Sequence, residues 1–287
     1  MAEKKLTCLL GSPVAHSISP AMHNLAFSEL GINCIYEAYD VDTSGLAAKV
    51  RDLRDADVLG FNLTMPDKQA MVGLCDELSD AARISESVNT VVNKGGKLIG
   101  HTTDGIGFMK ACEDAGFDPL KGKMVLLGAG GAACSILVQA ALDGVPEITV
   151  FNRPGRNWDK ISRMIDVLRQ ETKCRILLSE YEPGVLGREL SQALLLVNAT
   201  SVGMAPDTES SPIEDDTLFH EGLGVFDIIY NPPETRLMKL ASGAGCRTAN
   251  GKLMLLYQGA AAFKIWTGRD MPVEKVKAAL FSEYNGK

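Results

Sequence analysis

A glycine-rich segment near the middle of the chain most constrains its fold. Residues 128–133 read GAGGAA and lie between a strand-like run, 123–127, and a helix-like run, 133–142. A buried strand, a tight glycine turn and an opening helix form an anion site, because the helix N-terminus presents free N–H groups and partial positive charge. Gly128 permits the turn, and Gly130 lets the backbone approach a pyrophosphate. We therefore predict a nicotinamide dinucleotide site here; the alternative is a tight helix–strand crossing without a ligand.

Composition narrows the class of protein. The chain has 287 residues, enough for about two domains, and 46% of them are hydrophobic. Its net charge of −7 disfavours nucleic acid as a partner. The apolar run at Leu6–Leu10 is too short for a signal peptide, and no segment approaches the ~20 apolar residues of a membrane span. Seven cysteines without a C-x-x-C pair fit free thiols in a reducing compartment, and the four histidines show no metal-ligand spacing. We expect a cytoplasmic protein without membrane, nucleic-acid or metal partners.

Strand and helix patterns alternate along the first ~100 residues. Ser19 is expected to cap a helix that has Pro20 at its first position, and Pro66 is expected to open another helix. The expected elements are strands at 6–10, 34–39 and 58–63, helices at 20–30 and 46–53, a hairpin of 88–93 with 97–101, and a helix at 105–115.

The second part of the chain repeats strand–helix alternation, which predicts a parallel, doubly wound, Rossmann-like sheet. Its strands are expected at 123–127, 147–151, 175–179, 194–198, 224–229 and 246–249. A strongly apolar helix is expected at 253–266. The predicted fold is therefore α/β. An α/β domain at 1–104, completed by 253–287, precedes a dinucleotide-binding domain at 105–252.

Four polar stretches of the first domain lie at strand ends or in loops, where sites are built. They are 11–20, 62–68, 87–90 and 100–105. Their hydroxyls and amides suit a polyhydroxylated ligand, and a lysine near an aspartate can move a proton. Each residue also has a plain structural interpretation. Ser19 and Asp104 are typical helix caps, Lys68 is typical of a solvated helix, and Asn62 and Asn89 could satisfy turns.

These stretches together resemble the shikimate dehydrogenase family, which includes quinate/shikimate dehydrogenases. The resemblance covers nearly the whole chain in order. Its motifs are G-x-P-V-x-H-S-x-S-P-x-M-H-N from Gly11, N-x-T-x-P-x-K from Asn62, V-N-T from Val88, T-D-G-x-G from Thr103, the glycine turn, N-A-T-S-V-G-M from Asn198, D-I-I-Y-N-P from Asp227 and G-K-L-M-L-L-Y-Q-G-A from Gly251.

The resemblance implies reversible, NADP-dependent reduction of 3-dehydroshikimate to shikimate in aromatic amino-acid biosynthesis. Lys68 and Asp104 would be the catalytic pair. Ser17, Ser19 and Tyr230 would bind the substrate carboxylate, and Thr64, Asn89 and Gln258 the ring hydroxyls. The pyrophosphate would lie on Gly128, Ala129, Gly130, Gly131 and Ala132, and the nicotinamide against Thr200, Val202, Ile228, Gly251 and Leu255. The last helix would return to the first domain. We expect a monomer or a homodimer.

Two departures from the family pattern bear on specificity. Thr102 stands where the family usually has asparagine, so one amide near the catalytic aspartate is lost. After the strand at 147–151, the chain has Asn152, Arg153 and Arg156, with Pro154 replacing the usual threonine. An NAD enzyme usually places an acid there, and an acid would repel a 2′-phosphate that arginine grips. NADP is favoured, with NAD as the alternative. Two other functions stay open: NAD-linked quinate oxidation, and a nucleotide-binding regulator without turnover.

Overall fold

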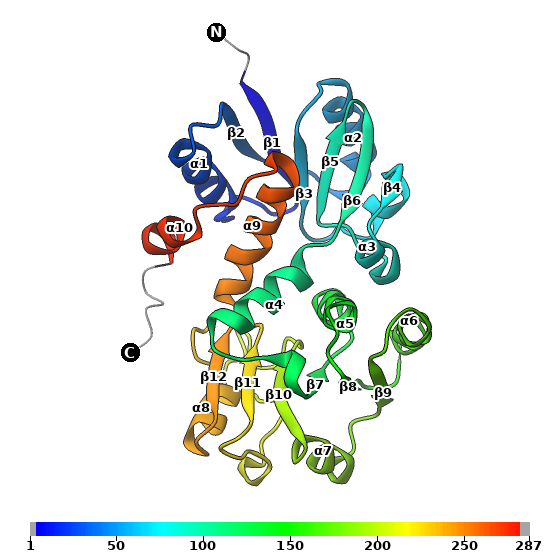
Figure 1. Cartoon of the computed structure of the whole chain (residues 1–287), viewed down its shortest axis with the longest axis vertical. Coiled ribbons are helices and arrows are strands. Elements are labelled where there is room, and N and C mark those ends of the chain that lie inside the picture. The colour runs from blue at the N-terminus through cyan, green and yellow to red at the C-terminus, as the bar shows by residue number, and fades with distance from the viewer. Residues whose placement is uncertain (1–3, 156, 282–287) are drawn as a thin grey trace. The chain divides into compact units, whose positions relative to one another are not determined.

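The computed structural model describes residues 4–155 and 157–281 (Figure 1). The chain divides into two compact units. The first comprises residues 1–107 and 256–287, and the second comprises residues 108–255. Our sequence-based boundaries lie slightly N-terminal to these. Two helices cross from one unit to the other: α4 (Asp104–Asp114) and α9 (Lys252–Thr267). No helix in the described part of the chain is long and apolar enough to cross a membrane.

The first unit is built on a six-stranded mixed sheet in the order β2-β1-β3-β5-β6-β4. Strand β1 pairs in parallel with β2 and β3, whereas β5 pairs antiparallel with β3 and β6. The register sets Asn62 of β3 directly opposite Thr90 of β5. The strands are β1 (Lys5–Gly11), β2 (Cys34–Asp40), β3 (Gly60–Leu63), β4 (Glu77–Leu78), β5 (Thr90–Lys94) and β6 (Lys97–His101).

Two layers cover this sheet. On one face, α2 (Thr43–Asp55), the 3₁₀ helix η1 (Ala70–Leu74) and α3 (Asp80–Ser85) bury an aliphatic core with β1 and β3. On the other, α1 (Ser19–Glu29) and α9 pack aromatic rings, among them Phe27 and Phe263, with centroids 5.1 Å apart. Trp266 of α9 donates a hydrogen bond from Nε1 to the carbonyl of Val91, 2.9 Å away. Gly60 leaves room for that indole, because a Cβ there would overlap it. The return of the last helix to the first unit is confirmed.

Two local expectations were wrong. Helix α1 begins at Ser19, because Ile18 already has helical dihedral angles and occupies the N-cap. Ser17 Oγ accepts the Ser19 N–H at 3.2 Å, two residues away. The helix expected at Pro66 is a turn, and the helical segment begins only at Ala70. The Lys68 carbonyl accepts a hydrogen bond from the N–H of Val88 at 2.9 Å. This carbonyl therefore bonds to a distant segment and not to the next turn of a helix.

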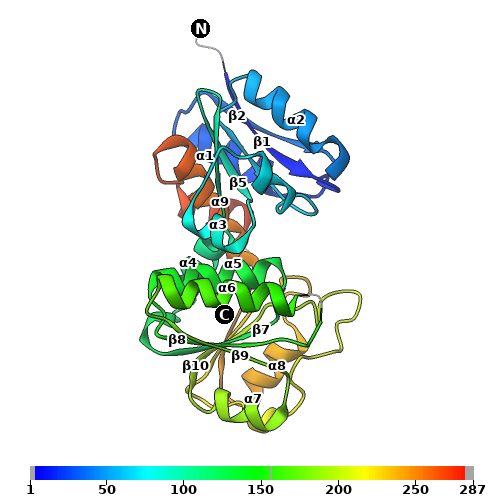
Figure 2. The same ribbon diagram turned by 90° about the vertical axis from the view of Figure 1, so that its right-hand side faces the viewer.

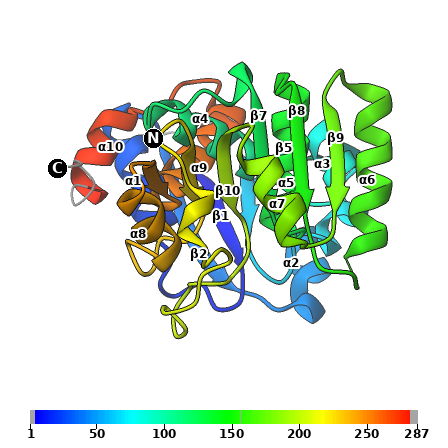
Figure 3. The ribbon, with the colours of Figure 1, turned by 90° about the horizontal axis from the view of Figure 1, so that it is seen from below.

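The second unit is a six-stranded, fully parallel sheet in the order β12-β11-β10-β7-β8-β9. The chain moves outward from β7 in one direction and then from β10 in the other, so the switch point of this doubly wound sheet lies between β7 and β10. Figure 3 shows β10, β7, β8 and β9 side by side in this order. The strands are β7 (Lys123–Leu127), β8 (Glu147–Phe151), β9 (Arg175–Ser179), β10 (Ala193–Asn198), β11 (Gly224–Asp227) and β12 (Arg247–Asn250).

Helices cover both faces of this sheet, as predicted for a Rossmann-like fold. Figure 2 shows α5 and α6 on one face and α7 and α8 on the other. The side chains of α7 and α8 bury a core with β7, β10 and β11. The helices are α5 (Gly131–Asp143), α6 (Trp158–Glu171), α7 (Pro183–Leu190) and α8 (Arg236–Gly243); η2 (Pro119–Lys121) and η3 (Asp216–Leu218) are 3₁₀ turns, and α10 (Val273–Leu280) belongs to the first unit.

Candidate active site

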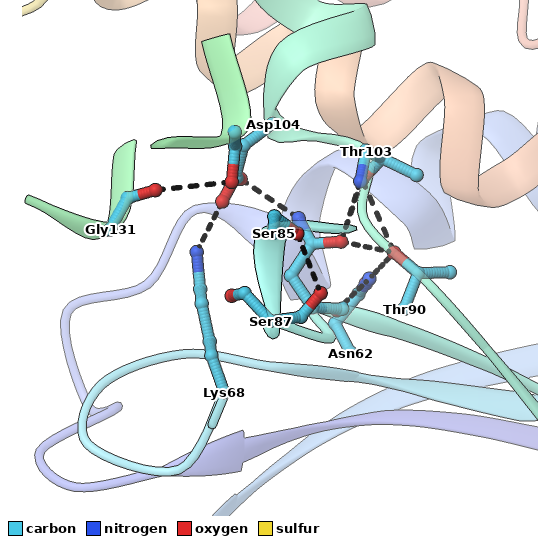
Figure 4. Close-up of polar contacts among 10 residues, drawn as sticks. Asn62, Lys68, Ser85, Ser87, Thr90, Thr103, Asp104 and Gly131 are labelled. Carbon is cyan, nitrogen blue, oxygen red and sulfur yellow. Dashed lines mark hydrogen bonds and ion pairs between the residues drawn. The ribbon is translucent and has the colours of Figure 1, made fainter. Parts of the chain in front are cut away.

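A lysine–aspartate ion pair lies in the first unit. Lys68 Nζ is 2.6 Å from Asp104 Oδ2, although the residues are far apart in sequence (Figure 4). Lys68 lies in the turn after β3, and Asp104 is the first residue of α4. The side chains are 28% and 12% exposed. The pair is thus largely sheltered from bulk water, and Lys68 remains partly exposed. An ammonium carries three donors, so Lys68 can bind Asp104 and still present a proton to a ligand.

The second oxygen of Asp104 is also engaged. Asn89 Nδ2 donates to Asp104 Oδ1 at 2.8 Å. Asn89 Oδ1 accepts the backbone N–H of Thr103 at 2.8 Å, which fixes the orientation of the amide. One N–H of Asn89 therefore holds the carboxylate, and the amide retains a second N–H for another acceptor. The result is a rigid aspartate whose two oxygens point at Lys68 and Asn89.

The residues expected to bind substrate occupy several places. Ser17 and Ser19 are neighbours at the start of α1, and both are half-buried. Thr64 follows β3, where its N–H donates to the carbonyl of Leu10 at 2.9 Å. Gln258 lies half-buried in α9 within the first unit, and Tyr230 lies exposed in the second unit on the loop after β11. Their binding roles stay predictions.

Buried polar side chains beside the Lys68–Asp104 pair were not assigned a role from the sequence. Asn62 Nδ2 donates to Thr90 Oγ1 at 2.9 Å, and Thr90 contacts Thr103 at 3.2 Å (Figure 4). Tyr36 Oη donates to Asn62 Oδ1 at 2.9 Å. Asn62, Thr90 and Thr103 lie within the motifs, but Tyr36 lies outside them. Asn62 meets Thr90 because β3 pairs with β5, and the sequence carried no signal for that pairing.

The glycine turn fits a dinucleotide. Gly128 has φ +104°, and a Cβ there would lie 2.9 Å from the carbonyl of Ala199. Gly130 is the N-cap of α5 and has no side chain, so the first N–H groups of this helix are not capped by the N-cap residue. A Cβ built at Gly130 or Gly131 meets no described atom within 4 Å. Free amides beside an open backbone are what a pyrophosphate requires.

Hydrogen bonds connect the carboxyl ends of β10 and β11. Asn198 donates to Asp227 at 3.1 Å, and its oxygen accepts the hydroxyl of Thr200 at 2.7 Å. Burial raises the pKa of Asp227, against the lowering effect of hydrogen bonds from Ile229, Thr235 and Asn198. The predicted nicotinamide residues lie on or beside these loops. Thr200, Val202, Ile228 and Leu255 are half-buried, and Gly251 packs so closely on Ile228 that a Cβ there would overlap its carbonyl.

The residues expected to determine the preference for NADP over NAD follow β8. Asn152 Nδ2 donates to the carbonyl of Arg153 at 3.0 Å, and the Arg153 side chain is exposed. Arg156 lies outside the described residues. Arg153 therefore stands as a cation at the strand end where dinucleotide folds recognise the adenosine ribose.

Known proteins match nearly the whole length of this chain. A model of the shikimate dehydrogenase substrate-binding domain matches residues 9–91, and one of the shikimate 5′-dehydrogenase C-terminal domain matches 253–281. A shikimate dehydrogenase (NADP+) of Alkaliphilus metalliredigens is 42% identical over 279 residues, covering 97% of both chains. The chain belongs to the shikimate dehydrogenase family.

Solved structures of this family support the fold of the whole chain. A shikimate 5-dehydrogenase from Listeria monocytogenes, in complex with shikimate and NAD, has a TM-score of 0.94 at 40% identity and covers 98% of both chains. The shikimate 5-dehydrogenase of Thermus thermophilus, in complex with NADP(H) and shikimate, has a TM-score of 0.80 at 34% identity, covering 96% of this chain and 98% of its own. The predicted family and α/β fold class are confirmed.

Proposed function

We propose that this chain catalyses the reversible NADP-dependent reduction of 3-dehydroshikimate to shikimate, with Lys68 and Asp104 as the catalytic pair. The observation that carries the assignment of residues is the 2.6 Å contact between a partly exposed Lys68 ammonium and Asp104. Membership of the shikimate dehydrogenase family supports the reaction and its cofactor.

The proton moves through Lys68. The reduced nicotinamide supplies a hydride to the carbonyl carbon when it is bound. Lys68 Nζ donates a proton to the oxygen of the forming alkoxide, and its positive charge stabilises the negative charge that develops there. Asp104 holds the ammonium in place through Oδ2. In the oxidation direction, Lys68 as the neutral amine accepts the proton of the substrate hydroxyl.

Binding of the substrate would use the neutral polar side chains of the first unit. Ser17 and Ser19 would donate hydroxyl protons to the carboxylate, joined by Tyr230. Thr64, Asn89 and Gln258 would bind ring hydroxyls, each as donor or acceptor. The amide of Asn89 would serve both the substrate and Asp104, which couples ring position to the catalytic pair.

Backbone N–H groups would bind the pyrophosphate of the cofactor, and arginine side chains would bind its 2′-phosphate. Residues 128–132 would receive the pyrophosphate, and Asn152, Arg153 and Arg156 would bind the 2′-phosphate. Replacement of Arg153 by alanine should lower kcat/KM for NADP about tenfold or more, because a charge-assisted contact is lost, and should leave NAD use unchanged. Equal use of NADP by Arg153→Ala and wild type would contradict this assignment.

The decisive experiment is a grid of initial rates. Shikimate and quinate are each oxidised with NADP and with NAD, and nicotinamide reduction is followed by absorbance. We expect the highest kcat/KM for shikimate with NADP. A higher value for quinate with NAD would indicate the catabolic enzyme, and no turnover in any combination would indicate a nucleotide-binding regulator.

A further inference from the structure

Building on the proposed function, we infer that Asp227 is a positioning residue that arranges the two loops expected to contact the nicotinamide before the cofactor binds. It acts through one carboxylate oxygen, Oδ1, whereas Oδ2 binds the start of helix α8. Asp227 is the last residue of β11 and is fully buried in the second unit. The loops in question follow β10 and β11.

The sheet places Asp227 beside the first of these loops. In the parallel register of β10 and β11, the last residues of the two strands, Asn198 and Asp227, are directly opposite each other. Asn198 Nδ2 donates to Asp227 Oδ1 at 3.1 Å, and both side chains are buried. Ligands of a parallel sheet bind at the carboxyl ends of its strands, so this bond lies at the edge of the sheet where the cofactor is expected.

Asn198 connects Asp227 to the loop after β10. Its Oδ1 accepts the backbone N–H of Thr200 at 3.1 Å and the Thr200 hydroxyl at 2.7 Å. Thr200 Oγ1 in turn accepts the N–H of Val202 at 3.1 Å. A carboxylate accepts and cannot donate, so Asp227 keeps the Nδ2 of Asn198 on its own side and the Oδ1 on the side of Thr200. The positions of Thr200 and Val202 therefore depend on a bond made behind them.

The second loop binds to the same oxygen. The Ile229 N–H donates to Asp227 Oδ1 at 3.0 Å, and Ile229 directly follows Ile228, which is expected to contact the nicotinamide. Oδ2 has a different partner, because the hydroxyl of Thr235, the N-cap of α8, donates to it at 2.8 Å. The two oxygens therefore support different parts of the unit: Oδ1 joins both expected cofactor loops, and Oδ2 joins α8.

This arrangement bears on affinity because the loops are ordered in advance. A ligand that has to order a loop loses part of its binding free energy, and a hydrogen bond that already orders the loop removes that cost. Loss of a hydrogen bond to a charged group corresponds to roughly a tenfold fall in affinity. Only a ligand that contacts these loops should show that fall.

The test compares two ligands on the same protein. NADPH contains the nicotinamide, whereas adenosine 2′,5′-bisphosphate carries the adenine and the 2′-phosphate without it. Asn198→Ala removes one bond to Oδ1 and leaves Asp227 with two donors, so it should raise the Kd for NADPH about tenfold at an unchanged Kd for the bisphosphate. Asp227→Ala should raise the Kd for NADPH at least as much. Isothermal titration calorimetry gives both constants.

Two further variants separate the two oxygens. Thr235→Val is the matched control, because it removes the bond to Oδ2 alone; it should lower the Tm and leave the Kd for NADPH unchanged. Asp227→Asn should behave like Thr235→Val, because its amide oxygen can accept from Asn198 and Ile229 while its amide nitrogen faces Thr235. Thermal unfolding shows whether Asp227→Ala is folded, and Asn198→Ala decides alone if it is not.

A double variant tests whether the two residues act through the same bond. Asn198→Ala combined with Asp227→Ala should raise the Kd for NADPH no further than Asp227→Ala alone. The inference is overturned if the two ligands are weakened equally, if Thr235→Val weakens NADPH binding as much as Asn198→Ala does, or if the two single effects multiply. Absence of NADPH binding to the wild-type protein would overturn the proposed function as well. Normal wild-type binding together with any of those three results overturns the inference alone.

Discussion

The two units contain lysine–carboxylate pairs of almost equal length. Lys68 and Asp104 are 2.6 Å apart in the first unit, and Lys123 and Glu189 are 2.5 Å apart in the second. The side chains of the first pair are 28% and 12% exposed, and those of the second 7% and 9%. Lys123 also contacts a second carboxylate, Glu147, at 3.1 Å. The separation of the charges therefore does not distinguish a site from a structural contact.

The surroundings of each pair decide what it can do. Thr149 donates to Glu189 at 2.8 Å, and burial, which alone would raise the pKa of Glu189, is outweighed by its hydrogen bonds from Lys123 and Thr149. Lys123 starts β7, at the end of the strand opposite the glycine turn, whereas ligands of parallel sheets bind at the carboxyl ends. The Lys123 contacts join β7, β8 and α7, whereas the Lys68 pair remains partly exposed.

The largest expected effect is on turnover at the exposed pair. Lys68→Ala should lower kcat by about 10²–10⁴, the usual range for a lost general acid–base group, with a smaller change in KM. Steady-state rates at neutral pH give the result, and thermal unfolding should show nearly wild-type stability. Near-wild-type turnover would remove Lys68 from the mechanism.

The buried pair should show the opposite pattern. Lys123→Met should lower the free energy of unfolding by about 3–5 kcal/mol, because the buried carboxylate of Glu189 loses its cation, whereas Glu147 keeps Arg175. The kcat per folded molecule should stay near the wild-type value. Urea unfolding measures the first and initial rates the second. Replacing Glu189 by leucine in the same chain should restore part of the loss, and no restoration would argue against a paired-charge explanation.

Removal of one hydroxyl from each unit tests the same difference between a binding site and a structural contact. Ser17→Ala should raise KM for shikimate about tenfold with a smaller fall in kcat, because a hydrogen bond to a charged carboxylate is lost equally in ground and transition states. Thr149→Val also removes a hydroxyl–carboxylate bond, but it should change stability and leave KM unchanged. A fall in kcat at constant KM for Ser17→Ala would contradict carboxylate binding.

At neutral pH, the smallest effect is expected for a buried residue outside both pairs. His23 lies among aromatic rings with neither ring nitrogen bonded to a described partner, and burial lowers its pKa to about 3. The unfolded chain binds a proton near pH 6.5 and the folded chain does not, so stability is lost as pH falls from about 6.5 toward 3, by at most about 1.4 kcal/mol per pH unit. His23→Phe should flatten this part of the urea-unfolding profile. An unchanged slope would assign the acid sensitivity to other groups.

Local patterns predicted most of the fold. The apolar strands and the glycine turn specify a Rossmann-like sheet because strand length and turn chemistry are short-range properties, and the structure confirms that fold class. Two errors were local as well: Ser19 is inside its helix, and Pro66 is in a turn whose carbonyls bind distant segments. Lys68 and Asp104 were predicted from resemblance, and their catalytic roles await experiment. The bonds of Tyr36 to Asn62 and of Lys123 to Glu189 join residues far apart in sequence, where neither spacing nor composition signals a contact.

The path of the chain through its two units sets an order of synthesis. The second unit is one continuous stretch, 108–255, and the first unit requires both 1–107 and 256–287. A ribosome therefore completes the nucleotide unit before the substrate unit, although it began the substrate unit earlier. The aromatic contacts of His23 and Phe27 with Phe263 and Trp266 close only when helix α9 has emerged. A nascent chain stalled before Trp266 carries Lys68 and Asp104, but His23 and Phe27 lack their aromatic partners from α9, and apolar surface exposed in this way favours aggregation.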